Sequence, residues 1–420
     1  MGSDMFVALK EASANQTTLF GLNYQAEAKQ CHTVQIVPGM IHEPGEVTHT
    51  STAAVPQTRQ TFAVLGVQPL DRWGFLHGVN ENRVAVGVTS WKSRRPSGPG
   101  ALSGPDLVRL ALQRSRGAHH AFEVLTDLLE HYGETPSHGS NDHIFLIADS
   151  TEAFVLEASG RYWAMLECSS TRAVTDAAMI RQDWRRLAPG LADFATERGW
   201  WTDDGNKLDF VRCLGEKNAQ TTAAQKRWGH ASLALAQQHG AIDLYFLRRM
   251  LADHDAVNGD LGLGTNPTAP AGSFLVDLAY VGHPPLAWVA FGGSKEPLYF
   301  PLCLVGELPL VFAEGIPAAF SIEQCVQELE SLSQGKENDQ ARLTGALERL
   351  QTCFDQDAED FLAKARAFQV QGKPYLIGQL ATEMMHKHVE LFTKEHHALL
   401  GIGAPTQLSA PVEEEMLYFA

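Results

Sequence analysis

The sequence predicts an α+β fold in which helices cover two blocks of β-strands, followed by an appended helical C-terminal region. Short apolar runs bounded by turn residues recur over residues 5–157 and return at 273–291. The segments between and after them show the i, i+3, i+4 apolar spacing of helices. Two β blocks with helices between them favour a sandwich in which helices cover sheets.

The composition is that of an ordinary globular protein. The chain has 420 residues, of which 44% are hydrophobic and 9% aromatic. Because single cores stop growing beyond roughly 250–300 residues, we expect a main domain over 1–305, a helical region over 306–400 and a polar tail over 401–420.

The net charge excludes two classes of partner, and the cysteine content indicates the compartment. The net charge is −16, and the densest basic cluster is Lys92, Arg94 and Arg95, so neither nucleic acid nor an anionic membrane is an expected partner. No apolar run approaches the ~20 residues of a membrane span, and no signal-peptide pattern opens the chain. Six cysteines without a CxxC pair are typical of reduced, buried thiols. We therefore expect a soluble cytoplasmic protein.

The first third is predicted to be mainly β. Residues 5–9 and 18–21 form short apolar runs separated by a polar turn at 14–16, which is a hairpin signal. The segment 94–104 is rich in Pro, Ser and Gly and is predicted as a loop. Further strands are expected at 33–37, 62–67 and 84–89.

The periodicity then becomes helical. Asp106 is a plausible cap for a helix over 107–114, and Phe122, Leu125 and Leu129 have helical spacing within 118–132. The later expected elements are strands at 143–148, 153–157, 273–280 and 286–291, and helices near 230–238, 245–252, 321–333, 339–367 and 376–400.

Short motifs along the chain share a distinctive order and spacing. They are SDMFVAL at 3–9, FGLN at 20–23, WG at 73–74, GVNE at 78–81, DLVRL at 106–110, DLLEHYG at 127–133, FLIAD at 145–149, GRYWA at 160–164 and GWWT at 199–202. Together they resemble the secernins and the dipeptidases related to them. The resemblance implies the four-layer αββα sandwich of N-terminal-nucleophile (Ntn) hydrolases, although folds host many functions.

The resemblance places the family's nucleophile position at Ser3. In such enzymes the nucleophile is the first residue, and its own α-amine takes the proton from the attacking group. Removal of Met1 by methionine aminopeptidase is expected, and an N→O acyl shift at Gly2–Ser3 would then free Ser3. A glycine before the nucleophile permits that shift sterically.

Three interpretations of position 3 stay open. Ser3 is a genuine nucleophile, or it replaces an original Cys in an unprocessed or inactive form, or Met1-Gly2-Ser3 is a cloning remnant. Under the first two interpretations, position 3 remains the nucleophile position.

The rest of the candidate site departs from the family's pattern. Leu22 stands where the family usually has Lys or Arg, Val88 stands where an Asn could stabilise the oxyanion, and Asp176 stands near the place of another Asn. Because Leu22 and Val88 are apolar, we expect a pocket that disfavours strongly charged substrates.

Other polar residues are candidates for the missing roles. Asn23 could donate to the oxyanion, although an Asn at a strand end is as often a turn former. The Thr89 hydroxyl could replace the missing donor. Asp176 could hold the α-ammonium of Ser3 or of a substrate, or be a solvated loop carboxylate. Asp4 and Asn80 are further substrate-binding candidates, with Asn80 favoured as a structural turn residue.

Neither a metal nor a cofactor is expected. His119 and His120 are adjacent on a helix and point about 100° apart, and His386 and His388 do not share a helix face. His138, Asp142 and His143 lack a recognisable metal-ligand spacing. The chain has no nucleotide-binding glycine motif and no GxSxG elbow.

The leading functional hypothesis is hydrolysis of a small amide or dipeptide-like substrate through an acyl-enzyme on Ser3. Acyl transfer to an amine is a variant on the same fold. The rival hypothesis is a non-catalytic interaction protein, motivated by Leu22, Val88 and long C-terminal helices that could form a homo-oligomer surface.

Overall fold

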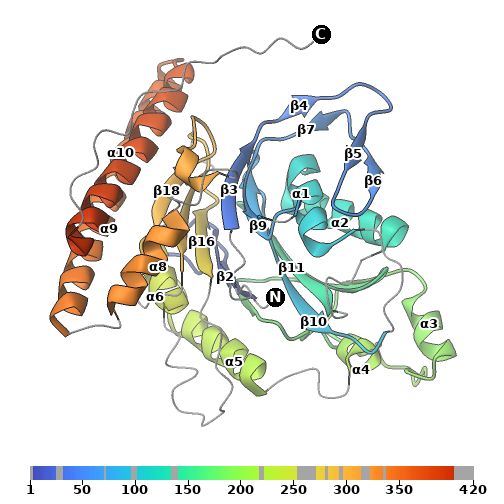
Figure 1. Cartoon of the computed structure of the whole chain (residues 1–420). Helices are drawn as coiled ribbons and strands as arrows, with labels where there is room; N and C mark the ends of the chain where they lie inside the picture. The colour runs from blue at the N-terminus through green and yellow to red at the C-terminus, as the bar shows by residue number, and fades with distance from the viewer. Residues whose placement is uncertain are drawn as a thin grey trace.

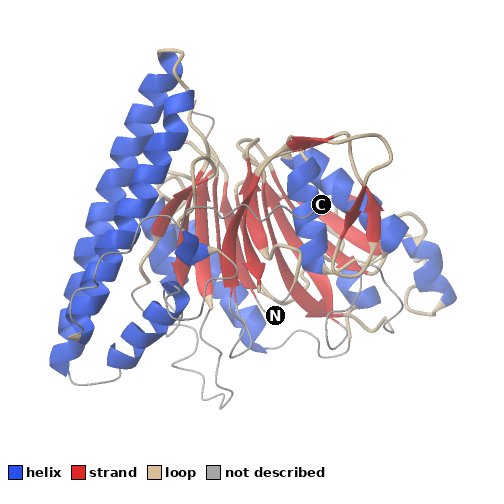
Figure 2. Cartoon of the chain, turned by 45° about the horizontal axis from the view of Figure 1, so that its top comes forward, coloured by secondary structure: helices blue, strands red, loops and turns tan. Residues whose placement is uncertain are grey.

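In a computed structural model of the chain, the structure describes residues 3–24, 32–70, 72–95, 102–133, 141–216, 222–252, 271–279, 282–292, 297–313, 322–333 and 337–401. Met1, Gly2, His138, residues 96–101 of the predicted loop and residues 402–420 of the predicted tail lie outside these ranges. Two antiparallel sheets stack face to face, and helices cover both outer faces (Figures 1 and 2). The predicted four-layer α+β sandwich with a helical C-terminal region is confirmed.

The first sheet carries the strand that begins at Ser3. Its strands, in spatial order, are β14 (Thr171–Val174), β1 (Ser3–Ala8), β2 (Leu19–Tyr24), β16 (Gly272–Asp277), β17 (Leu286–Phe291) and β18 (Phe300–Cys303). The turn between β1 and β2 is closed by Ser13, whose Oγ donates to the Thr17 carbonyl at 2.6 Å and accepts from the Thr17 N–H at 2.8 Å. The predicted hairpin is confirmed, with Ser3 opposite Tyr24 and Met5 opposite Leu22.

The second sheet packs face to face against the first, and its Gly87 lies against residues of the first sheet. Its strands, in spatial order, are β15 (Arg186–Leu187), β13 (Tyr162–Glu167), β12 (Ala153–Ser159), β11 (Asn141–Ala148), β10 (Ala85–Lys92), β9 (His77–Asn80), β8 (Val64–Pro69) and β3 (His32–Val37). A Cβ added at Gly87 would lie 2.8 Å from Leu22 Cδ2 and 3.0 Å from Met5 Sδ. Because side chains alternate along a strand, Ser3, Met5, Leu22 and Tyr24 all face the second sheet.

Two helices cover the outer face of the second sheet, α1 (Gly104–Arg114) and α2 (Ala118–Tyr132). The prediction that Asp106 caps the first helix is wrong, because Ser103 is the cap residue. Ser103 Oγ accepts from the Asp106 N–H at 3.3 Å, and the Asp106 carboxylate accepts from the Ser103 N–H at 3.1 Å. This capping box starts the helix three residues earlier than predicted.

Helices α5 (Thr222–Gln237) and α6 (Leu244–Ala252) cover the outer face of the first sheet, and α8 (Ile322–Ser333), α9 (Glu337–Val370) and α10 (Tyr375–Leu400) continue this layer over β17 and β18 (Figure 1). Phe300 of β18 lies 5.4 Å, between ring centroids, from both Phe354 of α9 and Phe392 of α10. Arg248 of α6 pairs with Asp355 of α9 through two contacts of 2.7 and 2.9 Å. The C-terminal helices thus share the core of the first sheet.

Several short elements were not predicted. They are β9, β15, β18, α3 (Leu191–Glu197), α4 (Phe210–Leu214), the 3₁₀ turn η1 (Leu310–Phe312), and the four small strands β4 (Met40–Ile41), β5 (Val47–His49), β6 (Ala54–Pro56) and β7 (Gln60–Thr61). The four small strands pair into two ribbons between β3 and β8. Each of these four strands has too few residues to show the alternation of apolar and polar residues that indicates a strand.

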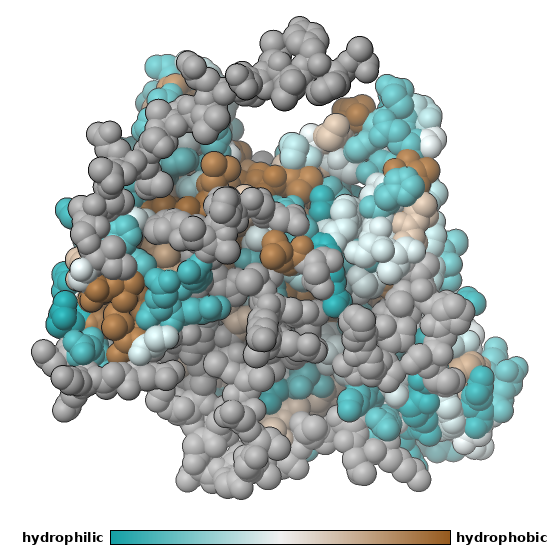
Figure 3. Space-filling view, viewed as in Figure 1, coloured by the Kyte–Doolittle hydropathy of each residue, from teal (hydrophilic) through white to brown (hydrophobic). Residues whose placement is uncertain are grey.

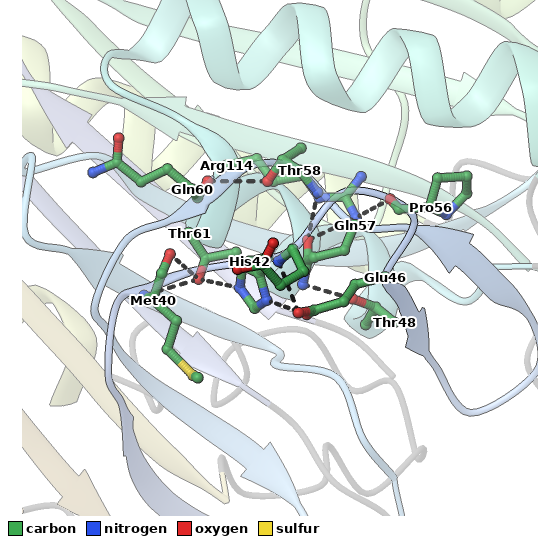
Figure 4. A network of polar contacts seen from close by, with 11 residues as sticks. Met40, His42, Glu46, Thr48, Pro56, Gln57, Thr58, Gln60, Thr61 and Arg114 are labelled. Carbon is green, nitrogen blue, oxygen red and sulfur yellow. Dashed lines mark hydrogen bonds and ion pairs between the residues drawn. The ribbon is translucent and has the colours of Figure 1, made fainter.

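Polar contacts hold these ribbons together (Figure 4). His42 Nδ1 lies 2.7 Å from Glu46 Oε2, and His42 Nε2 lies 3.0 Å from the buried Thr61 Oγ1. The Thr61 hydroxyl also accepts from the Met40 N–H at 3.2 Å. Thr61, His42 and Glu46 thus follow the order of a hydroxyl–imidazole–carboxylate relay. The buried Thr61 hydroxyl, however, is hydrogen-bonded to the Met40 backbone, and this bond joins β4 to β7. Met40 and Ile41 are exposed, and hydrophobic atoms are visible over this hairpin in Figure 3.

Within the described residues, no helix is both long and apolar enough to cross a lipid bilayer. Five of the six cysteines lie in these residues, and all five are free thiols.

Candidate active site around Ser3

The nitrogen of Ser3 is held between the two sheets. Ser3 is the first residue of β1 and is 6% exposed, and its N–H donates to Thr89 Oγ1 of β10 at 2.8 Å. Thr89 is itself buried, and it lies 86 residues away in the sequence. Thr89, which was predicted as a substitute oxyanion donor, therefore lies beside Ser3 and accepts a hydrogen bond from the Ser3 N–H.

An arginine bridges two of the predicted acidic residues. Arg227 of α5 donates from Nε to both Asp4 carboxylate oxygens at 3.2 Å, and its Nη2 donates to Asp176 Oδ1. Burial raises the pKa of Asp4, and the nearby Asp176 charge adds to this rise, while Arg227 opposes it. Asp4 and Asp176 thus lie together, on one guanidinium, beside the start of β1.

Asn23 lies on the opposite face of the first sheet from the Ser3 side chain. Its Nδ2 donates to the Leu251 carbonyl of α6 at 2.7 Å, and its Oδ1 accepts from Ser273 Oγ at 2.5 Å. Asn23 is opposite Asp4 in the ladder, and both side chains face the helices. The structure does not bring the Asn23 amide toward Ser3.

Leu22 and Val88, the two apolar residues that depart from the family's pattern, point to different faces of their sheets. Leu22 faces the second sheet, where it packs beside Met5 under Gly87. Val88 precedes Thr89 on β10, so its side chain points to the other face of that strand. Of the two, Leu22 alone shares the inner face with Ser3.

Asn80 has a structural environment. Its Nδ2 donates to the Leu112 and Ser115 carbonyls, both at 2.8 Å, and its Oδ1 accepts from the N–H groups of Asn82 and Val84, both at 3.0 Å. Every hydrogen-bonding capacity of the amide is used. Asn80 ties the β9–β10 turn to the C-terminal end of α1.

No metal site is found in the described part of the chain, where no three His, Cys, Asp or Glu side chains are grouped to hold an ion. His388 and His396 of α10 instead pair with carboxylates of other helices, Asp357 at 3.1 Å and Glu328 at 3.0 Å.

No protein-family model matches the sequence. Among solved structures, the chain is similar to penicillin V acylase from Agrobacterium tumefaciens, at 13% identity over 71% of this chain and 86% of that one, with a TM-score of 0.44. It is similar to a mutant conjugated bile acid hydrolase from Clostridium perfringens (11% identity, 72% and 92% coverage, TM-score 0.42). A third similar structure is the Caenorhabditis elegans ortholog of N-acylethanolamine-hydrolyzing acid amidase. It has 11% identity over 66% of this chain and 92% of that one, with a TM-score of 0.32. By name these are an acylase, a hydrolase and an amidase. At these values the likeness carries no weight for this chain's activity.

The GWWT motif lies apart from Ser3. The Trp200 and Trp201 N–H groups donate to the Ala195 carbonyl at 2.8 and 3.2 Å, which closes the end of α3. The two indoles line a surface pocket of about 280 Å³ together with Arg212 of α4.

Two functional candidates were missed in the sequence: Arg227 and Glu157. No local pattern marks Arg227, because its partners lie 51 and 223 residues away. Glu157 did have a signal, since it is the one charged residue in the otherwise apolar strand AFVLEAS.

Glu157 anchors the segment that follows Asp176. Its buried carboxylate accepts from the Met179 N–H at 2.5 Å and from the Ile180 N–H at 3.0 and 3.1 Å. Burial raises the pKa of Glu157 to about 7, against the lowering effect of these two N–H donors. This carboxyl therefore titrates in the neutral range.

The raised pKa predicts a stability that falls as pH rises. The folded-state pKa lies above the unfolded value of 4.5, so the folded chain binds the proton more tightly. We expect the stabilisation from this group to be fully present below pH 4.5 and lost as pH rises through about 7. Urea unfolding at several pH values should show this slope in the wild type and a flatter one in Glu157→Gln. An equal slope in both proteins would contradict the assignment.

Proposed function

We propose that the chain is an Ntn-type amidohydrolase in which Ser3 cleaves small amide or dipeptide-like substrates. The observation that supports this most is the 2.8 Å hydrogen bond from the Ser3 nitrogen to Thr89 Oγ1 at the first residue of β1. In a chain that begins at Ser3, this nitrogen is an α-amine with a pKa near neutrality. Thr89 then holds this α-amine beside the Ser3 hydroxyl. The amine is the general base that takes the proton from that hydroxyl.

The proposed reaction has two halves. As Ser3 Oγ bonds to the amide carbon, its proton passes to the α-amine, and the α-ammonium then protonates the leaving amine as the C–N bond breaks. Water hydrolyses the resulting ester, giving up a proton to the same amine and restoring the Ser3 hydroxyl. One base thus serves both halves.

Thr89 suits two roles at once. A hydroxyl has one donor and two acceptor sites, so Thr89 Oγ1 can accept from the Ser3 nitrogen while its own proton is donated to the tetrahedral oxyanion. We propose this donor role for Thr89, and a positioning role for Asn23, which joins β2 to α6 and β16.

The Asp4–Arg227–Asp176 cluster is proposed to fix the start of β1. Asp4 directly follows Ser3, and its carboxylate is held by Arg227, which Asp176 holds from the other side. Because proximity and orientation lower the barrier of such reactions, loosening this cluster would displace Ser3 from Thr89.

A second candidate is a non-catalytic interaction protein. It is favoured by the Asn23 amide, which lies on the far face of the sheet from Ser3, and by Leu22 at an expected cationic position. Acyl transfer to an amine uses the same acyl-enzyme as hydrolysis and differs only in the acceptor.

Intact-mass measurement tests the proposal first. We expect purified protein to lack Met1 and Gly2, because the Ser3 hydroxyl attacks the Gly2 carbonyl to release Ser3. The Ser3→Ala variant should keep Gly2. Wild-type protein that keeps Gly2 after prolonged incubation would indicate a proenzyme, a form in which Ser3 replaces Cys, or the non-catalytic candidate. Loss of Gly2 from Ser3→Ala would assign its removal to another enzyme.

A further inference from the structure

A surface pocket lies between α3 and α4, on the side of the molecule away from α9 and α10 (Figure 1). Its volume of about 280 Å³ is just under the roughly 300 Å³ at which typical small-molecule sites begin. The lining includes Trp200, Trp201 and Asp204 of the α3–α4 loop, and Arg212 and the buried Cys213 of α4. A ligand with one ring and a short side chain is therefore of the right size.

The walls of this pocket are held in place by contacts within the protein. The Trp200 ring lies 5.5 Å from the Phe194 ring in an edge-to-face arrangement, and the Arg94 guanidinium lies 4.8 Å over it. Arg94 Nη2 also donates to the Arg212 carbonyl, which ties the loop to α4. The partly exposed Trp201 ring has no aromatic or cationic partner within the described residues. The pocket is thus preformed, and one indole remains to contact a ligand.

Two charged groups of the pocket are engaged by the protein itself. Lys207 Nζ donates to the Trp184 carbonyl at 3.1 Å and lies 4.3 Å over the Trp184 ring. Asp209 accepts from the Arg212 N–H at 2.9 Å as the cap of α4, and its other oxygen pairs with Arg181 at 3.1 Å. Lys207 and Asp209 therefore serve the structure of the pocket.

The Arg212 guanidinium is not engaged in this way. It is exposed, and it has no hydrogen bond or ion pair within the part of the chain that the structure describes. A guanidinium presents its donors in a planar fork that matches a carboxylate. In the same pocket the Trp201 indole offers an apolar ring face. A carboxylate attached to an aromatic body would contact both groups.

The neighbouring carboxylates limit the charge of this ligand. Asp204 and Asp209 line the same pocket as Arg212. The Asp204 carboxylate accepts from the Asn206 N–H at 3.0 Å, and the hydrogen bonds from Asn206 lower its pKa, so it is ionised at pH 7. Two carboxylates repel a phosphate dianion more than they repel a carboxylate. The pocket therefore favours a carboxylic acid over a phosphate ester.

We propose that this pocket binds a small aromatic monocarboxylate, with its carboxylate on Arg212 and its ring against Trp201. The site is separate from Ser3 and does not depend on the proposed amidohydrolase activity. A free arylalkanoic acid and a peptide that ends in an aromatic residue share this chemistry, and the volume of the pocket favours the free acid. Because Arg212 is exposed, we expect a Kd on the order of a millimolar.

Fluorine NMR line broadening measures this binding. The probe is 3-(4-fluorophenyl)propanoate, and its uncharged match is 3-(4-fluorophenyl)propanamide. Wild-type protein should bind the acid about tenfold more tightly than the amide, the size of one hydrogen-bonded contact to a charged group. Both 4-fluorophenyl phosphate and acetyl-Ala-4-fluorophenylalanine should bind no more tightly than the acid. Equal affinities for the acid and the amide, tighter binding of the phosphate or the peptide, or no broadening of any probe would overturn the proposal.

Arg212→Met should remove the preference for the acid over the amide. Arg185→Met is the matched control, because Arg185 is also exposed, lies outside the pocket and carries the same charge. This variant should keep the tenfold preference. A preference that persists in Arg212→Met would place the binding elsewhere, the Ser3 site included. A preference lost equally in Arg185→Met would assign it to overall charge, and either result overturns the site.

Two further variants test the other walls of the pocket. Trp201→Leu should weaken the binding of acid and amide alike, by about fivefold, and leave their ratio unchanged. Asp204→Asn should strengthen the binding of the phosphate relative to the acid. If Trp201→Leu has no effect, the ring does not contact the ligand and the proposal fails. None of these measurements depends on turnover at Ser3, so an inert wild type would count against the proposed function alone.

Discussion

Replacing Ser3 with alanine is expected to abolish turnover, by at least about a thousandfold in kcat/KM. The change removes the hydroxyl oxygen that we propose forms the acyl-enzyme bond, while the backbone nitrogen that donates to Thr89 Oγ1 is retained. Stability should change little, because Ser3 is the terminal residue of its strand. A panel of p-nitroanilides and dipeptides, followed by absorbance and by mass spectrometry, measures the effect.

Ser3→Cys distinguishes the interpretations of position 3. If a cysteine is the natural residue, this variant should lose Gly2 readily and turn over amides faster than the serine form. If serine is natural, the activity should stay equal or fall. Equal turnover by wild type and Ser3→Ala would place the active site elsewhere in the chain.

Replacing Arg227 with methionine should give the largest loss of stability among the site variants, about 2–3 kcal/mol. The change leaves the Asp4 and Asp176 carboxylates close together without their shared cation, in a site where burial already raises the pKa of Asp4. The expected loss of stability is smaller than that for a fully buried ion pair, because the Asp176 side chain is 33% exposed to solvent. Urea unfolding at pH 7.5 measures this loss.

The pH dependence and a control variant test the cause. Without the guanidinium, the folded-state pKa of Asp4 rises further above 3.8, so the deficit should be full at pH 7.5 and shrink as pH falls toward 5. Arg249→Met removes the same charge from the exposed face of α6 and should cost under about 0.5 kcal/mol. A pH-independent deficit, or one equal to that of Arg249→Met, would show that the cluster does not hold β1.

Strongly periodic elements could be predicted from the sequence. The predicted bounds of α2 and β17 match the structure, because the first has a clear apolar stripe and the second is an apolar run between turns. Helix α5 begins at Thr222, before the predicted start near 230, since TTAAQK has no large apolar residue to mark a period.

The faces of the central strands could not be predicted. Strand β2 is buried on both faces, because helices cover one and the second sheet covers the other. A strand without alternating polarity does not indicate which residues point inward, and a shift of one residue exchanges the faces. Asn23 was therefore expected near Ser3, while Tyr24, the next residue, faces the second sheet with Ser3.

The strand order of the first sheet places β1 among segments that lie far from it in the sequence. Strand β1 is flanked by β14 and β2, and β2 in turn pairs with β16, whose last residue is Asp277. Because a domain generally folds as a unit, β2 has both of its neighbouring strands only after residue 277 of the 420 has been synthesised. The surroundings of Ser3 are thus assembled from segments made at widely separated times, and the last of the strands around β1 and β2 is made long after Ser3 itself.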